Sequence, residues 1–257
     1  MGAHTPKNNC SVADDWFAVA FGDLYPVVYA HRTVEAAMPE ATFAAAAIHL
    51  NPSDHVLDLC CGAGRHLATL EKYGACLTGL DYSPQLLKYA RARLSMTTGL
   101  VRADMRRLPF LSCFDVVFSF FTSFGYFLKE TDNTRAAEEM ARTLKPGGRF
   151  FMDYLNPLYV ARTLKPESRR TSHGYTIDEQ RWIDEAAKRV NKKVTVTQDG
   201  RYMGATTESV RLYALEELTL LLGSVGLRVD ELWGDYEGAV YGEGAPRMIL
   251  KGVRTGS

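Results

Sequence analysis

The chain has 257 residues, of which 46% are hydrophobic and 23% are charged, as in an ordinary globular protein. This composition excludes a disordered or collagen-like chain, and the length allows a large core that needs no disulfide or metal. The 30 basic and 30 acidic residues balance, whereas proteins that hold nucleic acid or an anionic membrane usually carry a basic excess. We therefore expect neither nucleic acid nor a membrane as a partner.

The five cysteines and the N-terminus indicate the compartment. The cysteine count is odd and Cys60 is adjacent to Cys61, which argues against a disulfide framework. The N-terminal residues lack the apolar run of a signal peptide. No apolar stretch approaches the roughly 18 residues that a membrane span requires, and no histidine completes a zinc motif. We expect a cytoplasmic protein without a metal site.

The first fifty residues are expected to be mostly helical. Apolar residues recur at spacings of three and four between Trp16 and Leu50, which is typical of helices that pack on one side. Pro39 stands within this stretch and is expected to kink or divide it. A turn signal at residues 51–54 ends the segment.

Strand and helix signals then alternate up to residue 155. Short apolar runs predict strands at 56–60, 76–80, 99–103, 114–120 and 149–155, with helical patterns between them. Ser83 followed by Pro84 is typical of a helix N-cap and first helical position. Repeated β-α units predict a parallel sheet with helices on both faces.

The alternation of strands and helices breaks after residue 155. Residues 156–209 are polar, with alternating runs such as 193–197, and Asp199-Gly200 is typical of a hairpin turn. This pattern predicts a small antiparallel β insertion. A helical stripe from Leu215 to Val225, ended by Gly226, and strands at 227–233 and 248–253 complete the chain.

Chemistry-bearing residues stand at three consecutive strand ends, where an open parallel sheet binds its ligands. The first strand leads into Gly62 and Gly64, and glycine lets a ligand approach the backbone. The second ends in Asp81, whose carboxylate can accept both hydroxyls of a ribose. The third ends in Asp104-Met105, a carboxylate for an exocyclic amine and an apolar cover for a flat ring. Taken singly, each feature also fits a tight turn or a helix cap.

The glycine loop is not that of a dinucleotide or nucleotide-triphosphate site. A dinucleotide loop needs G-x-G-x-x-G, because the pyrophosphate sits on a helix N-terminus. Counting from Gly62, the third glycine position holds Leu67, and the loop offers no lysine for a phosphate. This argues against a nicotinamide-dependent oxidoreductase and against a P-loop.

Residues 56–64, VLDLCCGAG, resemble motif I of class I S-adenosylmethionine-dependent methyltransferases of the small-molecule type. The segments 79–84, 103–105, 114–118 and 144–148 resemble the later motifs of this family, in order and at similar spacing. Cys60 stands where the usual G-x-G-x-G motif has its first glycine, and we expect a mild strain there without loss of binding. The resemblance implies a Rossmann-like, seven-stranded, mostly parallel sheet whose last strand is antiparallel. It also implies S-adenosylmethionine as cofactor and S-adenosylhomocysteine as product.

The resemblance also implies roles for individual residues. The loop from Gly62 to Gly64 would face the amino-acid part of the cofactor with Asp58 beneath it, and Phe120 would line the path of the methyl group. Arg32 either pairs with the cofactor carboxylate or is an ordinary surface arginine. The full set of expected cofactor residues is Tyr29, Arg32, Asp58, Cys60, Gly62, Gly64, Asp81, Tyr82, Asp104, Met105 and Phe120.

The acceptor is expected above the same strand ends. That region is rich in tyrosine, which suits a small acceptor with polar and flat parts, although a tyrosine can equally end a core with a solvated hydroxyl. No catalytic residue can be assigned from the sequence. The expected acceptor residues are Tyr126, Tyr154, Arg211, Tyr213 and Tyr236.

The sequence therefore predicts three parts and one activity. Residues 1–50 would cover the cofactor site, residues 51–155 and 210–257 would form the methyltransferase domain, and residues 156–209 would be a lid or a dimerisation element. The expected activity is transfer of a methyl group to N, O or C of a small molecule, and a homodimer is one expected assembly. The alternatives are a protein or RNA methyltransferase, or a non-catalytic protein that binds S-adenosylmethionine or S-adenosylhomocysteine.

Overall fold

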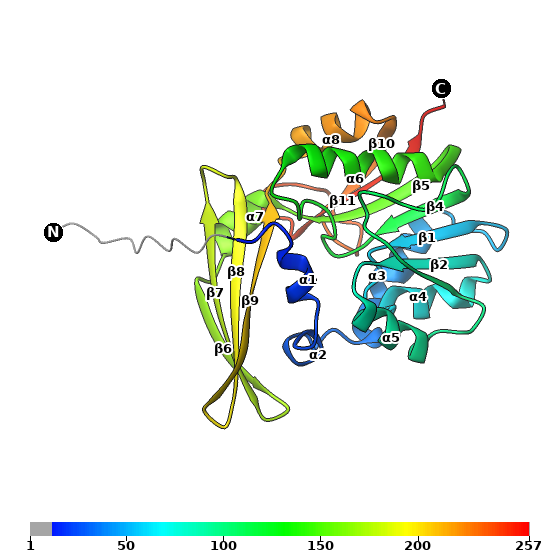
Figure 1. Cartoon of the computed structure of the whole chain (residues 1–257). Coiled ribbons are helices and arrows are strands. Elements are labelled where there is room, and N and C mark those ends of the chain that lie inside the picture. Colours follow the sequence, from blue (N-terminus) through cyan, green and yellow to red (C-terminus); the bar gives the residue numbers. More distant parts are fainter. Residues whose placement is uncertain (1–11, 257) are drawn as a thin grey trace.

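The computed structural model describes residues 12–256, which form two β-sheets and the helices around them (Figure 1). The larger sheet has seven strands in the order β10-β11-β5-β4-β1-β2-β3. Only β11 runs antiparallel to its neighbours, pairing with β5 on one side and β10 on the other. The predicted sheet with an antiparallel last strand is confirmed. Its strands are β1 (His55–Leu59), β2 (Cys76–Asp81), β3 (Gly99–Arg102), β4 (Phe114–Ser119), β5 (Leu144–Leu155), β10 (Leu227–Trp233) and β11 (Arg247–Arg254).

Helices cover both faces of this sheet because its strands are apolar on both sides. Val56 and Val116 pack on one face, and their chain neighbours Leu57 and Val117 pack on the other, as the period of two in a strand requires. Helices α6 (Glu130–Thr143) and α8 (Leu215–Ser224) lie on the face of Leu57. Helices α3 (Val34–Ala47), α4 (Arg65–Leu70) and α5 (Pro84–Arg93) lie on the other, where the short helix η1 (Glu71–Tyr73) continues α4 (Figure 1).

The N-terminal segment is helical, but it divides at a different place from the one predicted. It forms α1 (Trp16–Ala20), α2 (Tyr25–Val28) and α3, and Pro39 lies inside α3 without ending it. The start of α3 is set by Thr33, whose hydroxyl oxygen accepts the N–H of Ala36 at 3.2 Å. The divisions therefore fall before α3, and the expectation of a division at Pro39 is wrong.

The insertion after β5 is a four-stranded antiparallel sheet, as predicted. A helix that the sequence analysis did not predict, α7 (Pro157–Thr163), comes first and is capped by the Asn156 side chain. The hairpin at Asp199 and Gly200 is confirmed, with φ values of 50° and 78°, the left-handed pair of a type I′ turn. Its strands are β6 (Glu167–Ser172), β7 (Tyr175–Asp184), β8 (Arg189–Gln198) and β9 (Arg201–Arg211).

Helices α1 and α2 lie between the two sheets (Figure 1). Val28 and Tyr29 pack against Ile177, Val194 and Val196 of the four-stranded sheet. The N-terminal segment is thus held by the insertion while it reaches the carboxyl ends of the central strands. Among residues 12–256, no helix combines the length and the apolar character needed to cross a membrane.

Candidate cofactor and acceptor site

A cavity of about 860 Å³, counting the space open to solvent at its mouth, lies beyond the carboxyl ends of β1 to β4. Most of the predicted cofactor residues line it, whereas Tyr29, Asp58 and Gly64 lie outside the lining. The predicted residues in its wall are Arg32, Cys60, Gly62, Asp81, Tyr82, Asp104, Met105 and Phe120.

Asp81 at the end of β2 organises the glycine loop. Its Oδ2 accepts the N–H of Gly62 at 2.8 Å and its Oδ1 accepts the N–H of Ser83 at 2.8 Å. These two bonds tie the loop after β1 to the start of α5. Burial raises the pKa of Asp81, against the backbone hydrogen bonds that lower it. Each carboxylate oxygen keeps a free lone pair, so the group can still accept hydrogen bonds from a ligand.

The three small residues of the loop have different roles. Cys60 has a φ of 63°, a left-handed conformation that costs a residue with a side chain roughly 1–2 kcal/mol, so the expected strain is present in the backbone. Gly62 also has a positive φ, and a Cβ there would meet only Leu86, at 3.9 Å. A Cβ on Gly64 would lie 2.8 Å from the Cδ1 of Leu94. Gly62 therefore faces the cavity, and Gly64 is a packing position against α5.

Asp104 lies at the cavity wall, where it forms an ion pair. Arg106 donates to both carboxylate oxygens, with Nη2 at 2.7 Å from Oδ2 and Nε at 3.1 Å from Oδ1. Burial alone would raise the pKa of Asp104, but the hydrogen bonds from Arg106 outweigh it and the pKa is lowered. The carboxylate is therefore ionised at neutral pH. Next to it, the sulfur of Met105 lies 3.9 Å from the Cys60 sulfur.

Phe120, directly after β4, is stacked on a histidine that the sequence analysis did not single out. The rings of Phe120 and His66 have centroids 4.0 Å apart and planes only 9° from parallel. His66 lines the cavity, and its Nε2 lies 2.7 Å from Oε2 of Glu40 in α3. Burial lowers the pKa of His66, against the hydrogen bond to Glu40 that raises it. The imidazole is therefore neutral at pH 7.

Arg32 and Tyr29, both predicted to bind the cofactor, are placed differently. The Arg32 guanidinium lines the cavity and stacks over the Tyr29 ring at 3.9 Å. The Nε of Arg32 is buried without a hydrogen-bond partner in the described part of the chain. The Tyr29 hydroxyl instead donates to Glu208 and accepts from Lys192, both in the four-stranded sheet. The Tyr29 ring therefore packs against the Arg32 guanidinium without lining the cavity itself.

Asp58 and Tyr82 complete the predicted cofactor set. Asp58 is buried in β1, and its Oδ2 has no hydrogen-bond partner among the residues that the structure describes. Burial, together with nearby Asp81, raises the pKa of Asp58 well above its ordinary value. Tyr82 lines the cavity, and its ring packs edge-on against Phe17 at 5.5 Å. Asp58 thus lies behind the wall that Tyr82 helps to form.

Of the predicted acceptor residues, Tyr126 lines the cavity. Its ring is stacked on Phe21, with centroids 5.7 Å apart and planes at 15°. Burial raises the pKa of Tyr126 well above its ordinary value, so the phenol is neutral. Aromatic side chains from the N-terminal segment and from the loop after β4 therefore form one wall.

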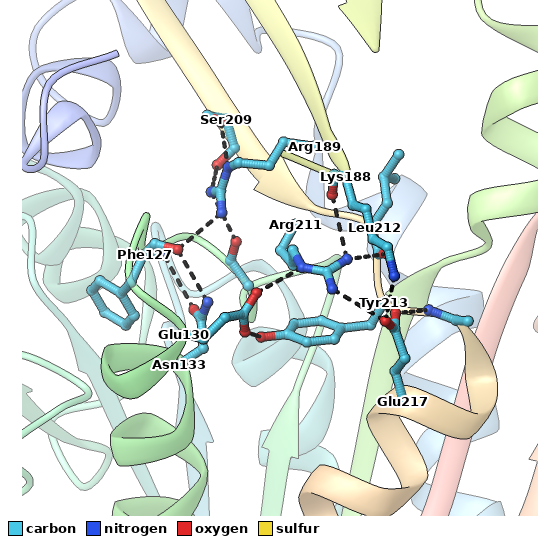
Figure 2. A network of polar contacts seen from close by, with 12 residues as sticks. Phe127, Glu130, Asn133, Lys188, Arg189, Ser209, Arg211, Leu212, Tyr213 and Glu217 are labelled. Atoms are coloured by element: carbon cyan, nitrogen blue, oxygen red, sulfur yellow. Dashed lines mark hydrogen bonds and ion pairs between the residues drawn. The ribbon is translucent and has the colours of Figure 1, made fainter. Parts of the chain in front are cut away.

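Three other predicted acceptor residues, Tyr154, Arg211 and Tyr213, belong to a polar network away from the cavity lining, and Figure 2 shows Arg211 and Tyr213 within it. Arg211 pairs with Glu130 at 2.7 Å and with Glu217 at 3.3 Å. Tyr213 donates its hydroxyl to Glu130, and Tyr154 donates its hydroxyl to the carbonyl of Arg211. These side chains join β9 to α6 and α8. Tyr154 and Tyr213 are both buried, so their hydroxyls bond to other groups of the protein and are not the solvated ends of a core that the sequence also allowed.

Arg189, the first residue of β8 in the insertion, belongs to the same network and forms hydrogen bonds to the cavity wall (Figure 2). Its buried guanidinium donates to the carbonyls of Phe127 at 2.9 Å, Tyr126 at 3.0 Å and Gly125 at 3.2 Å. Two more bonds reach the side chain and carbonyl of Ser209, at 2.7 and 2.9 Å. The loop after β4 is thus fixed by the four-stranded sheet.

Tyr236, the last predicted acceptor residue, also lies outside the cavity lining. It packs beside Phe43, at 5.9 Å between ring centroids, and beside Phe151. Its hydroxyl has no hydrogen-bond partner in the described part of the chain. Burial raises its pKa well above the ordinary value, and nearby Asp153 adds to this shift.

Several cavity residues were missed by the sequence analysis. Arg65 and His66 follow the glycine loop directly, so their place at the start of α4 was a usable signal. The N-terminal aromatics gave no such signal, because only the tertiary fold brings α1 and α2 to the strand ends. The missed lining residues include Phe17, Phe21, Tyr25, Arg65, His66, Phe121 and Ser123.

Comparison with known proteins identifies the family. Residues 56–148 match the family model described as "Methyltransferase domain". The chain is 28% identical to the cypemycin N-terminal methyltransferase of Streptomyces sp, over 76% of this chain and 81% of that protein. It is 30% identical to the demethylmenaquinone methyltransferase of Mycolicibacterium vanbaalenii, over 65% of this chain and 78% of that protein. Some other curated relatives are matched over only 40% to 56% of their length.

A solved structure shows the same fold over nearly the whole chain. The CcbJ methyltransferase of Streptomyces caelestis superposes with a TM-score of 0.77 at 21% identity, covering 92% of this chain and 98% of that one. The methyltransferase relatives and the seven-stranded sheet with its glycine loop both indicate the same family. The chain belongs to the class I S-adenosylmethionine-dependent methyltransferases.

Proposed function

We propose that this methyltransferase transfers the methyl group of S-adenosylmethionine to a nitrogen, oxygen or carbon atom of a small organic acceptor. The observation that carries the proposal is the aromatic-walled cavity, whose wall also holds Asp81, Asp104 and Arg32. A cavity with such a wall suits a small flat or polar molecule. The balanced charge of the chain argues against nucleic acid as the acceptor.

The cavity wall offers a partner for each part of the cofactor. Arg32 has a buried Nε without an acceptor, which the carboxylate of the cofactor would supply. Asp81 keeps lone pairs for the ribose hydroxyls, and Asp104 with Met105 would hold the adenine. When bound, S-adenosylmethionine supplies the methyl group and its leaving group. The protein residues orient the acceptor and exclude water, and alignment alone can lower the barrier by several kcal/mol.

His66 is the group in the cavity wall best suited to take a proton from the acceptor. Glu40 accepts the hydrogen bond at Nε2, 2.7 Å away, so the neutral ring keeps its lone pair at Nδ1. A base is needed only when the nucleophile arrives protonated. His66 would then act as base for an amine or hydroxyl acceptor, with Glu40 fixing the tautomer.

The flanking segments would control access. Residues 1–50 would cover the cofactor, because α1 and α2 supply Phe17, Phe21 and Tyr25 to the cavity. Residues 156–209 would form a lid support or a dimer contact, since Arg189 fixes the wall at residues 125–127. Homodimerisation and a cytoplasmic location remain predictions.

The names of the relatives do not identify the acceptor, because they describe different acceptors. The acceptor must therefore be identified by experiment. One relative is named for the N-terminus of cypemycin, a nitrogen, and another for a quinone. We therefore propose a methyl-transfer screen with radiolabelled S-adenosylmethionine against amines, phenols and quinols. Calorimetric titration with S-adenosylmethionine, S-adenosylhomocysteine and NADH comes first. Binding of the two sulfur nucleosides without NADH is expected, and the absence of both would refute the proposed site.

A further inference from the structure

One end of the cavity carries two guanidinium groups without counter-charges. Arg32 and Arg65 both line the cavity, and both lie over the ring of Phe121, at 4.8 Å and 5.6 Å from its centroid. Within residues 12–256, neither has a carboxylate oxygen within 4.0 Å. Arg247, the third guanidinium over the same ring, is neutralised by Asp153 at 2.6 Å. Both arginines are half-buried, and a charge withdrawn from water is normally paired, so an anionic ligand would complete this end.

The backbone that carries the ring of Phe121 is held by hydrogen bonds. Phe121 and Thr122 both have left-handed backbones, with φ values of 57° and 62°. The N–H of Phe121 donates to Oδ2 of Asp153 and the N–H of Thr122 to its carbonyl, each at 2.9 Å. Arg247 donates to the Thr122 hydroxyl oxygen at 2.8 Å. Such strain persists only where the surroundings enforce it, and here it fixes the surface on which both arginines rest.

The cofactor alone leaves this end with excess positive charge. S-adenosylmethionine has one carboxylate, but it also carries an ammonium and a sulfonium group. If Arg32 holds the carboxylate, Arg65 still lacks a partner. Burial and the nearby Arg32 both lower the pKa of Arg65, as expected for a desolvated cation. The nearest acidic groups, Glu40 and Asp58, lie beyond ion-pair distance, and Glu40 is engaged by His66.

We propose that Arg65 binds an oxyanion of the methyl acceptor, so that the acceptors of this enzyme carry a carboxylate or a phosphate. A guanidinium presents paired N–H donors that match either group. This inference rests on the proposed function, including the assignment of Arg32 to the cofactor. An acceptor held at Arg65 would lie beside Phe120 and His66, which share the same wall.

The test uses the full-length protein saturated with S-adenosylhomocysteine. Pyrophosphate and malonate are titrated separately by calorimetry, at constant ionic strength held with sodium chloride. We expect saturable binding of at least one probe, and the preferred probe distinguishes a phosphate from a carboxylate subsite. Arg65→Met should weaken that binding about tenfold or more, the loss expected for a charged hydrogen bond. Arg65→Lys keeps the charge and should lose less, and Arg162→Met, on the exposed end of α7, should bind as the wild type does.

Unchanged probe binding by Arg65→Met would overturn the inference, and so would either of two results on the wild-type protein. One is the absence of saturable binding of both probes above the sodium chloride control. The other is direct competition between a probe and S-adenosylhomocysteine, which would assign both arginines to the carboxylate of the cofactor. The proposed function is judged separately, by S-adenosylhomocysteine binding without any probe.

Discussion

The two glycines of the loop after β1 provide a matched test of the site. Gly62 and Gly64 both have positive φ values, 56° and 72°, so alanine at either position carries a similar backbone strain of roughly 1–2 kcal/mol. The space around them differs. A Cβ on Gly62 would meet only Leu86 at 3.9 Å, whereas one on Gly64 would lie 2.8 Å from Leu94 and 3.2 Å from Ala90.

Because the contacts differ, we expect the Gly64 variant to lose stability and the Gly62 variant to lose ligand affinity. Overpacking a buried position costs about 1–3 kcal/mol, and the backbone strain cancels between the two variants. Gly64→Ala should therefore be less stable than Gly62→Ala by about 1–3 kcal/mol. Each kcal/mol corresponds to about 2–4 °C in Tm for a chain of this size. Gly62→Ala should keep most of its stability and lose affinity for S-adenosylhomocysteine, because its new methyl group enters the cavity.

Thermal and urea denaturation of the ligand-free proteins measure the first effect, and calorimetric titration with S-adenosylhomocysteine measures the second. The reasoning fails if Gly64→Ala is as stable as Gly62→Ala. It also fails if Gly62→Ala binds the ligand with wild-type affinity, because the cofactor would then lie elsewhere.

Three further predictions concern single side chains. Asp81→Ala should weaken S-adenosylhomocysteine binding by about 1–3 kcal/mol, and unchanged affinity in calorimetry would remove Asp81 from its role. The pKa of His66 is lowered from 6.5, so the wild type should lose stability as the pH falls below 6.5, where the unfolded chain binds the proton first. Urea denaturation across this range should show a smaller loss for His66→Gln, and equal slopes would contradict the assignment. Arg189→Met strands three carbonyls and should cost about 3 kcal/mol or more, whereas Arg162→Met should leave Tm unchanged.

The sheet could be predicted because its signals are local. Strand β2 was predicted to within one residue, since the apolar run from Cys76 stops at Asp81. The start of α5 was visible in Ser83-Pro84, and Ser83 does accept the N–H of Leu86. Strand β5 starts five residues earlier than expected, at Leu144 instead of 149, because Phe114 of β4 already pairs with Leu144. Pairing between distant segments is invisible to local pattern.

Most of the predicted residues at the strand ends line the cavity, as their places in the chain indicate, whereas four of the five predicted acceptor residues do not. Gly62 follows β1 and Asp81 ends β2, so these two strands fix their positions. Tyr154 and Tyr213 were grouped with the mouth by chain position, but their hydroxyls point to Arg211 and Glu130. The sequence shows which strand end a residue follows; the direction of its side chain depends on partners contributed by other elements.

The separation of charge along the cavity also bears on how a ligand arrives. A nucleoside with a charged amino-acid tail has an electrical direction, and so does a cavity lined by Asp81, Asp104, Arg32 and Arg65, in which the two arginines lie together over the ring of Phe121. The field of the protein can turn such a ligand before contact. Because salt screens charges over about 8 Å at physiological ionic strength, this alignment works only over the last steps of approach. Those four side chains would therefore affect the association rate more than the dissociation rate.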